Sequence, residues 1–169
     1  MVAAAGSVAI DTELERARDV AAAVLDPEIP VITLAELGVL RSAARRDGRI
    51  VVTLTPTYTG CPATAAIHMA VETALLDAGL PNARVETVLS PAWTTDDITA
   101  AGRAKLRAYG IAPPNKTAPE GLFADDHVDC PKCGSAHTTK LSEFGSTACK
   151  AQWRCDSCRE PFDYFKCHR

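Results

Sequence analysis

The stretch that decides the C-terminal fold reads CPKCGSAHTTKLSEFGSTACKAQWRCDSC and spans residues 130–158. Its two ends are Cys-x-x-Cys pairs, with 21 residues between the second cysteine of one pair and the first of the other. Each pair can present two sulfur atoms to one ion from a tight turn, and two such turns complete a tetrahedral four-sulfur shell. The spacing therefore predicts a zinc ribbon whose metal ligands are Cys130, Cys133, Cys155 and Cys158.

The chain around these cysteines is too short to fold on apolar contacts alone. A segment of about 40 residues buries too little surface, so a bound metal would supply the missing stability. The residues between the two pairs suit a hairpin with strands at 138–141 and 151–154. Four thiolates accept either Zn²⁺ or an iron–sulfur cluster, and spacing alone does not separate the two. Two reduced pairs without any metal are the remaining alternative.

Two further cysteines of this region stand outside the two pairs. Cys149 and Cys167 are either small packed residues on the ribbon strands or a second, labile thiol pair, and both interpretations stay open. Three histidines, His127, His137 and His168, lie near the ribbon in the sequence. Because four cysteines already fill a tetrahedral shell, we expect these histidines to be exposed to solvent.

The composition is that of an ordinary globular protein. The 169 residues are 47% hydrophobic and 23% charged, and the formal net charge is −3. These values argue against a mostly disordered chain and against a general nucleic-acid binder, which would carry a basic excess. No apolar run reaches the length of a membrane span, and the Ala-rich N-terminus lacks the basic region of a signal peptide. We therefore expect a cytoplasmic protein with no nucleic-acid or membrane partner.

A shift in composition divides the chain into two domains. Most aromatic residues and cysteines lie after residue 128, whereas the first 110 residues are built from Ala, Val, Leu and Ile. Between these parts, residues 111–127 contain three prolines and no hydrophobic periodicity, which is typical of a linker. The prediction is an α/β domain at 1–110, a linker at 111–127 and a zinc ribbon at 128–169.

The first domain begins with a helix and a hairpin. Thr12 and Glu15 form a capping-box pattern, so the helix is predicted to start there and to end before the loop at 26–30, whose two prolines exclude regular structure. Strands are predicted at 39–44 and 50–55, on either side of an Asp-Gly turn.

The rest of the first domain adds two helices and a strand. A second helix is expected from Pro62 to Gly79, a third strand at 85–89, and a third helix that Thr94 or Thr95 caps. The order helix, strand, strand, helix, strand, helix predicts a small α/β sandwich with its helices on one face of the sheet. The whole chain is thus expected to be α+β, a sandwich followed by a four-cysteine ribbon.

Cys61 lies where a strand meets a helix, in the stretch LTPTYTGCPA at 54–63. The pattern places it at the helix N-cap, where free backbone amides and the helix dipole favour a thiolate. A lowered thiol pKa would make Cys61 a nucleophile or a soft-metal ligand, and an inert packed cysteine is the alternative. Asp26 and Glu28 reach Cys61 if their loop folds across it, whereas His68 lies too far along the helix to act as its base.

Five motifs resemble those of a known family. DPEIP at 26–30, LGVL at 37–40 and LTPTYTGCP at 54–62 resemble the iron–sulfur-assembly-associated domain shared by SufT-like and PaaD-like proteins. FGSTACKA at 144–151 and EPFDYFKCH at 160–168, together with both Cys-x-x-Cys pairs, resemble specifically the PaaD proteins of bacterial phenylacetate degradation. The resemblance covers nearly the whole chain from about residue 12.

The resemblance implies an accessory role rather than catalysis by the chain itself. PaaD-like proteins are maturation factors for the multicomponent phenylacetyl-CoA epoxidase and help to install or maintain its iron or iron–sulfur centres. The implied partners are the oxygenase and iron–sulfur reductase subunits or iron–sulfur assembly proteins, and the implied cofactors are a structural Zn²⁺ and a transient iron–sulfur cluster. Cys61 would be the transfer ligand, Asp26 and Glu28 would shape its pocket, and Thr57 and Thr59 would line the same loop.

Other functions stay open beside this one. The chain can be a structural subunit or docking module of the oxygenase complex, since zinc ribbons commonly bind other proteins. It can also be a thiol-dependent enzyme that uses Cys61, although the first domain offers no second cysteine to resolve an intermediate. A homodimer is a further expectation, because two facing subunits would each contribute one Cys61.

Overall fold

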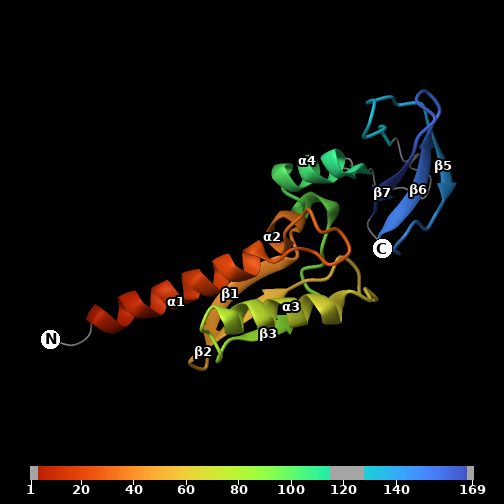
Figure 1. The fold of residues 1–169 in the computed structure, drawn as a ribbon. Helices are drawn as coiled ribbons and strands as arrows, with labels where there is room; N and C mark the ends of the chain where they lie inside the picture. The colour runs from red at the N-terminus through yellow and green to blue at the C-terminus, as the bar shows by residue number, and fades with distance from the viewer. Residues whose placement is uncertain (1–3, 115–127, 167–169) are drawn as a thin grey trace. The chain divides into compact units, whose positions relative to one another are not determined.

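The computed structural model describes residues 4–114 and 128–166, and of the first helix it describes side chains from Thr12 onward. The chain splits into two compact units, Met1–Trp93 and Thr94–Arg169, and each is described here by itself (Figure 1). The second unit begins before the boundary expected at residue 110. Residues 115–127 of the expected linker lie outside the described ranges.

The first unit is built on a three-stranded sheet in the order β1-β2-β3. β1 (Leu40–Arg46) and β2 (Arg49–Leu54) pair in antiparallel fashion, as the Asp-Gly turn predicts, with φ of 50° at Asp47 and 77° at Gly48. β3 (Arg84–Thr87) pairs in parallel with β2, and helix α3 (Thr64–Asp77) makes the crossover between them.

Two helices cover one face of this sheet. α1 (Ala4–Ala23) contacts β1, β2 and α3, and Figure 1 shows α1 and α3 running along the sheet. Every residue of the central strand from Ile50 to Leu54 is buried. The predicted sandwich with its helices on one sheet face is confirmed for this unit.

The start of α1 differs from the prediction. The helix begins at Ala4, so Thr12 lies inside it rather than at its cap. Alanine has the highest intrinsic helix propensity, and the helix continues from Ala4 through Gly6 to Thr12 without a proline to end it. A capping box forms instead at α2 (Leu34–Leu37), where Thr33 and Glu36 bond each other's backbone amides at 3.1 and 3.0 Å.

The second unit opens with two short helical elements where one helix was expected. A 3₁₀ turn, η1 (Thr95–Asp97), is capped by Thr94, and α4 (Ala100–Tyr109) is capped by Thr99. The two are separate because Ile98 is extended, with φ −69° and ψ 122°.

The ribbon sheet has four strands in the order β4-β7-β6-β5. β5 (Thr138–Ser142) and β6 (Lys150–Cys155) are the predicted hairpin strands. β7 (Pro161–Phe165) pairs antiparallel with β6, and β4 (Ile111–Ala112) pairs parallel with β7, so two residues of the expected linker belong to this sheet. The zinc-ribbon prediction is confirmed as a fold, with two more strands than the sequence analysis placed.

The ribbon core combines aromatic side chains with two of the cysteines. Trp153 and Phe162 are buried together with Cys130 and Cys155, and Tyr164 packs edge-on against Trp153 with ring centroids 6.1 Å apart. Aromatic residues of this tail therefore serve its core. In the part of the chain that the structure describes, no helix combines the length and the apolar character that crossing a membrane requires.

Candidate metal centre and the Cys61 site

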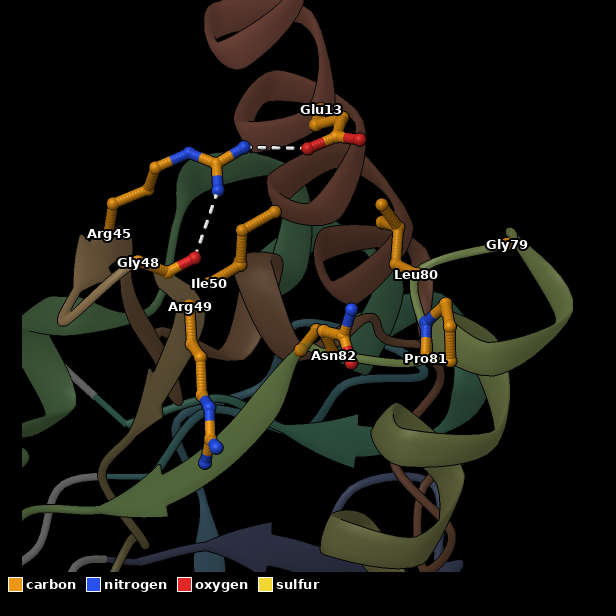
Figure 2. Close-up of a pocket in the computed structure, with 10 residues that line it drawn as sticks. Glu13, Arg45, Gly48, Arg49, Ile50, Gly79, Leu80, Pro81 and Asn82 are labelled. Atoms are coloured by element: carbon orange, nitrogen blue, oxygen red, sulfur yellow. Dashed lines mark hydrogen bonds and ion pairs between the residues drawn. The ribbon is translucent and has the colours of Figure 1, made fainter.

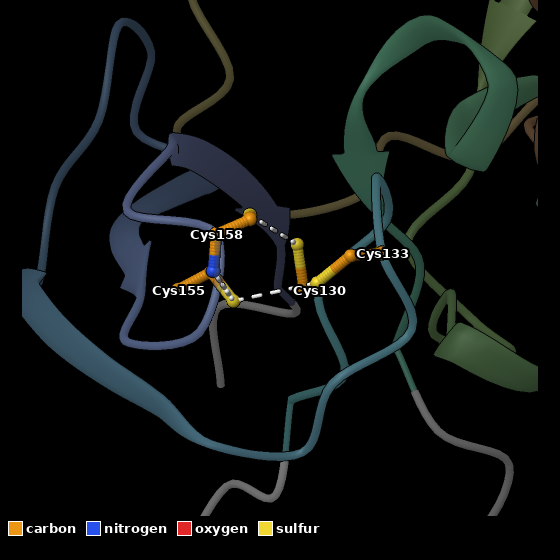
Figure 3. A group of neighbouring side chains, drawn as sticks. All are labelled: Cys130, Cys133, Cys155 and Cys158. Carbon is orange, nitrogen blue, oxygen red and sulfur yellow. Dashed lines mark hydrogen bonds between the residues drawn. The ribbon is translucent and has the colours of Figure 1, made fainter.

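The four predicted metal ligands converge on one point. The Sγ atoms of Cys130, Cys133, Cys155 and Cys158 all lie within 4.8 Å of one another (Figure 3). Two of the distances are 3.8 Å, from Cys130 to Cys158, and 3.6 Å, from Cys133 to Cys155. A tetrahedral site with metal–sulfur bonds of about 2.3 Å has sulfur–sulfur edges of about 3.8 Å. The donor set and its spacing therefore fit a tetrahedral thiolate-bound ion such as Zn²⁺.

Each Cys-x-x-Cys pair sits on a turn of the same shape. The amide of Gly134 donates to the carbonyl of Cys130 at 2.9 Å, and the amide of Arg159 donates to the carbonyl of Cys155 at 2.9 Å. Both donors follow the second cysteine of their pair and have positive φ, 73° for Gly134 and 67° for Arg159. Glycine adopts this conformation without strain, whereas an arginine there costs about 1 kcal/mol.

The two cysteines of each pair have different surroundings. Cys130 and Cys155 are almost fully buried, Cys158 is half-buried and Cys133 is exposed. The amide of Cys158 donates to the Cys155 sulfur at 3.4 Å, and amides of Cys158 and Ser157 lower the pKa of the Cys155 thiol to about 6. Cys155 therefore offers a thiolate at neutral pH and, together with Cys130, anchors the site in the core.

Of the other ribbon cysteines and histidines, the structure describes Cys149 and His137. Cys149 is buried, and its sulfur lies 3.0 Å from the Thr147 hydroxyl. His137 is exposed, as expected. Cys167, His127 and His168 lie outside the described residues, so a pairing of Cys149 with Cys167 stays a prediction.

The acidic-proline loop is held by one of its own carboxylates. The Oδ1 atom of Asp26 accepts the amides of Glu28 and Ile29, both at 2.9 Å. Asp26 is only 7% exposed, and Ile29 beside it is buried in the core. Asp26 therefore fixes the backbone on which Glu28 sits.

The position of Cys61 differs from the predicted N-cap. The residue at the cap of α3 is Ala63, and Cys61 lies two residues before it. Its carbonyl accepts the Thr64 hydroxyl at 2.9 Å and the Thr64 amide at 3.2 Å, while its own amide donates to Tyr58 at 3.3 Å. Pro62 and Ala63 form a turn that precedes the helix, so Cys61 lies outside the first turn of α3.

The predicted lowering of the Cys61 pKa is wrong. Burial raises the pKa of this thiol above its ordinary value of 9.0, and the negative charges of Glu28 and Asp26 raise it further. Contacts with the Ala63 amide and with Thr64 lower the pKa, but burial, the largest contribution, keeps the net shift upward. Both carboxylates therefore act on Cys61 in the same direction as burial, and the raised pKa keeps the sulfur a protonated thiol at neutral pH.

We expect Cys61 to alkylate slowly at neutral pH. Because its pKa is raised, the thiolate fraction and the iodoacetamide rate should keep increasing as pH passes 9. Glu28→Gln removes a charge that disfavours the thiolate and should speed the reaction about two- to threefold at pH 8. Glu72→Gln on the exposed side of α3 is the control and should change nothing. Mass spectrometry of the Cys61 peptide measures the rate, and a plateau below pH 8.5 would contradict the raised pKa.

Cys61 opens onto a shallow depression of about 560 Å³. His68 and Thr87 also line it, and their side chains are joined by a hydrogen bond of 2.6 Å between Nε2 and Oγ1. Met69, on the same rim, is 67% exposed. Thr57 and Thr59 lie in the preceding loop, outside the residues that line this depression. The sulfur is thus half-buried but has an open approach from solvent.

A second pocket, of about 130 Å³, lies at the other end of β2 (Figure 2). The Arg45 guanidinium there donates to the Glu13 carboxylate at 2.6 Å and to the Gly48 carbonyl at 3.4 Å. These contacts join α1 to the β1–β2 turn. The pocket is therefore a structural feature of the helix–sheet interface, and the Cys61 depression is the better candidate for function in this unit.

Comparisons with known proteins match both units of the chain. Residues 14–90 match the family described as iron–sulfur cluster assembly protein, and residues 114–166 match the PaaD zinc beta ribbon domain. The chain is 51% identical, over 84% of its length and 86% of the relative's, to an Escherichia coli protein. The name of that protein begins "Putative 1,2-phenylacetyl-CoA epoxidase" and designates it as one of the subunits.

A solved structure supports the fold of the first unit. It is a domain of unknown function, DUF59, from Bacillus anthracis, with a TM-score of 0.51 at 23% identity, over 57% of this chain and 92% of that one. At that identity the likeness concerns the fold alone. Because 51% of the residues are identical over 84% of this chain and 86% of the relative, and both domain models match in this chain, it belongs to the PaaD family, an iron–sulfur cluster assembly domain followed by a zinc β-ribbon.

Proposed function

We propose that this protein assists the assembly or repair of an iron or iron–sulfur centre in a phenylacetyl-CoA epoxidase and does not itself turn over the substrate. Its partners would be the oxygenase and iron–sulfur reductase subunits of the epoxidase or iron–sulfur assembly proteins; the name of the Escherichia coli relative designates that protein as an epoxidase subunit. The observation that carries the proposal is the pairing of one accessible thiol with two carboxylates, in a unit that matches iron–sulfur cluster assembly proteins.

The Cys61 site suits a cation that has to leave again. A protonated thiol beside Glu28 and Asp26 carries excess negative charge, which attracts cationic iron and repels anions. When the iron arrives, the S–H bond breaks, the S–Fe bond forms and the proton goes to solvent. One protein thiolate at an open depression gives a weak hold, so the iron can pass to a client.

The four-cysteine site of the ribbon suits a metal ion that stays bound. Four thiolates in tetrahedral geometry close the coordination shell of an ion, and two of the four are part of the core. Such a site retains its metal, so the proposal gives the ribbon a structural or docking role. Zn²⁺ is the proposed occupant, because the geometry suits a single tetrahedral ion and the matched family is a zinc ribbon.

The raised pKa of Cys61 weighs against a thiol-dependent enzyme. A nucleophilic cysteine needs a thiolate at working pH, and burial with two neighbouring carboxylates opposes one here. A permanent subunit or docking module stays the second candidate, favoured by the word "subunit" in the relative's name. Copurification with the oxygenase at fixed stoichiometry would support this second candidate over a transient factor.

The test is anaerobic loading with Fe²⁺ and sulfide, followed by gel filtration and analysis of iron, sulfide and zinc. Wild type should retain iron that a chelator removes within minutes, whereas Cys61→Ser should retain little, with equal zinc in both. Cys149→Ser removes a buried thiol that is not in the four-cysteine cluster and should load like wild type. Equal iron in wild type and Cys61→Ser would contradict the proposal, and gel filtration of the loaded protein also reports whether two copies share the iron.

A further inference from the structure

The two cysteine turns of the ribbon repeat each other in backbone bonding beyond the cysteines themselves. The amide of Cys130 donates to the carbonyl of Ser135 at 2.9 Å, and the amide of Cys155 donates to the carbonyl of Glu160 at 3.0 Å. In each turn the acceptor lies five residues after the first cysteine. The amides of Gly134 and Arg159 also donate to the carbonyls of Cys130 and Cys155 in the same way. The two turns therefore have the same backbone hydrogen bonds at the same positions.

The contacts between the two turns follow the same equivalence. Lys132, two residues after the first cysteine of its turn, donates to the Glu160 carboxylate at 2.7 Å. Ser157 occupies the corresponding position in the other turn, and its hydroxyl lies 2.8 Å from the hydroxyl of Ser135. Each contact thus joins the third position of one turn to the sixth position of the other. The short sulfur–sulfur distances show the same exchange between the turns. Cys130, the first cysteine of one turn, lies near Cys158, the second of the other, and Cys133 lies near Cys155 in the reverse order.

We propose that these two reciprocal contacts, the Lys132–Glu160 ion pair and the Ser135–Ser157 hydroxyl pair, form a clasp that sets the rate at which the ribbon loses its metal. The clasp holds the two cysteine turns together by side chains that are not metal ligands. Metal loss requires the turns to separate or a thiolate to swing away, and the clasp opposes separation. Lys132 and Glu160 are therefore positioning residues of the metal site.

Charge gives Lys132 a second effect on the metal. Four thiolates around a divalent ion leave a net charge of −2, and a nearby ammonium group offsets part of it. Lys132 lies between Cys130 and Cys133 in the first turn, and its ammonium group is 2.7 Å from the Glu160 carboxylate of the second turn. The ion pair thus joins the two turns and keeps a positive charge on the turn that carries Cys130 and Cys133.

The size of the effect on metal binding distinguishes this clasp from an ordinary surface ion pair. The side chains of Lys132 and Glu160 are 49% and 53% exposed, and an exposed pair that only adds Coulomb attraction changes an equilibrium by at most about fivefold. Partners that orient metal ligands change metal affinity by about 10- to 100-fold when they are removed. The clasp predicts the larger effect.

The experiment measures zinc release from the full-length, zinc-loaded protein into an excess of the chromogenic chelator 4-(2-pyridylazo)resorcinol. Lys132→Met keeps the length of the side chain and removes its charge, and it should speed release about tenfold. Lys140→Met is the matched control, because Lys140 also forms an exposed ion pair in the ribbon, with Glu143 at 3.3 Å, away from the cysteine turns. Total zinc per chain before the chelator is added shows that each variant starts with a filled site.

Two further variants distinguish pairing from charge or misfolding. Lys132→Glu places two carboxylates opposite each other and should release zinc faster than Lys132→Met does. The exchanged pair Lys132→Glu with Glu160→Lys restores the contact and should return release to within about threefold of wild type. Release from Lys132→Met within twofold of the Lys140→Met rate would overturn the proposal, and so would an exchanged pair that is as fast as Lys132→Glu alone.

Discussion

Replacing Cys155 by serine should empty the ribbon metal site and unfold the second unit, while the first unit stays folded. Cys155 is fully buried among the ribbon core residues and its sulfur lies 3.6 Å from that of Cys133. A serine hydroxyl is a poor ligand for a soft site and leaves three thiolates. Structural zinc contributes an apparent folding free energy of about 10–16 kcal/mol, far more than a core of this size supplies without metal. The zinc content of the purified protein should fall from about one ion per chain to less than about a tenth of an ion per chain.

Cys149→Ser is the control for this result. Cys149 is also a buried ribbon cysteine, but its sulfur contacts the Thr147 hydroxyl and is not in the four-cysteine cluster. The Cys149→Ser variant should keep a full complement of zinc.

Limited proteolysis should cut the Cys155→Ser variant after residue 94 and leave the first unit resistant, because the two units are separately compact. Zinc content in Cys155→Ser equal to that of wild type would reject the structural metal.

The metal ligands could be predicted from the sequence because the signal is local. Two cysteines three apart fit one turn, and the tetrahedral shell then requires the other pair, so no knowledge of the sheet is needed. The clasp could not be predicted in this way. Lys132 and Glu160 are 28 residues apart, and only the hairpin of β5 and β6 brings their turns into contact. Strand β7 was missed for a similar reason, since it is short, opens on Pro161 and is defined by its pairing with β6.

Helix ends were the weakest part of the sequence analysis. Thr12 with Glu15 and Thr33 with Glu36 have the same capping-box spacing, but only the second pair forms the box. The first lies within a helix that alanine extends toward the N-terminus, so propensity outweighed the local motif. The motif at Thr33 is effective because the backbone is already extended there, with φ −85° and ψ 161°.

The Cys61 environment shows where a local rule is insufficient. The strand–loop–helix pattern correctly places Cys61 just before a helix, and the rule that a helix N-terminus lowers a thiol pKa then predicts a thiolate. The rule fails because burial, with smaller contributions from the carboxylates of Glu28 and Asp26, outweighs the pKa-lowering contacts with the Ala63 amide and Thr64. Those carboxylates lie more than thirty residues earlier in the chain, so their effect depends on how the acidic-proline loop folds.

Replacing Cys61 by serine should abolish support for the epoxidase in cells without affecting the fold of this protein. The thiol is half-buried at an open depression, and serine differs from it by one atom, so the free energy of unfolding should change by less than about 1 kcal/mol. Serine does not replace a thiolate as a ligand for iron. Circular dichroism and zinc content should therefore match those of wild type, and Cys149→Ser again serves as the control.

The most direct test of the account is the iron content of the epoxidase reductase and oxygenase subunits, purified from cells whose only copy of this protein is wild type, Cys61→Ser or Cys149→Ser. If the sulfur of Cys61 delivers iron, the Cys61→Ser cells should yield epoxidase subunits with at least about tenfold less iron and matching loss of activity, while the Cys149→Ser cells match wild type. Fully loaded, active epoxidase from the Cys61→Ser cells would contradict the account.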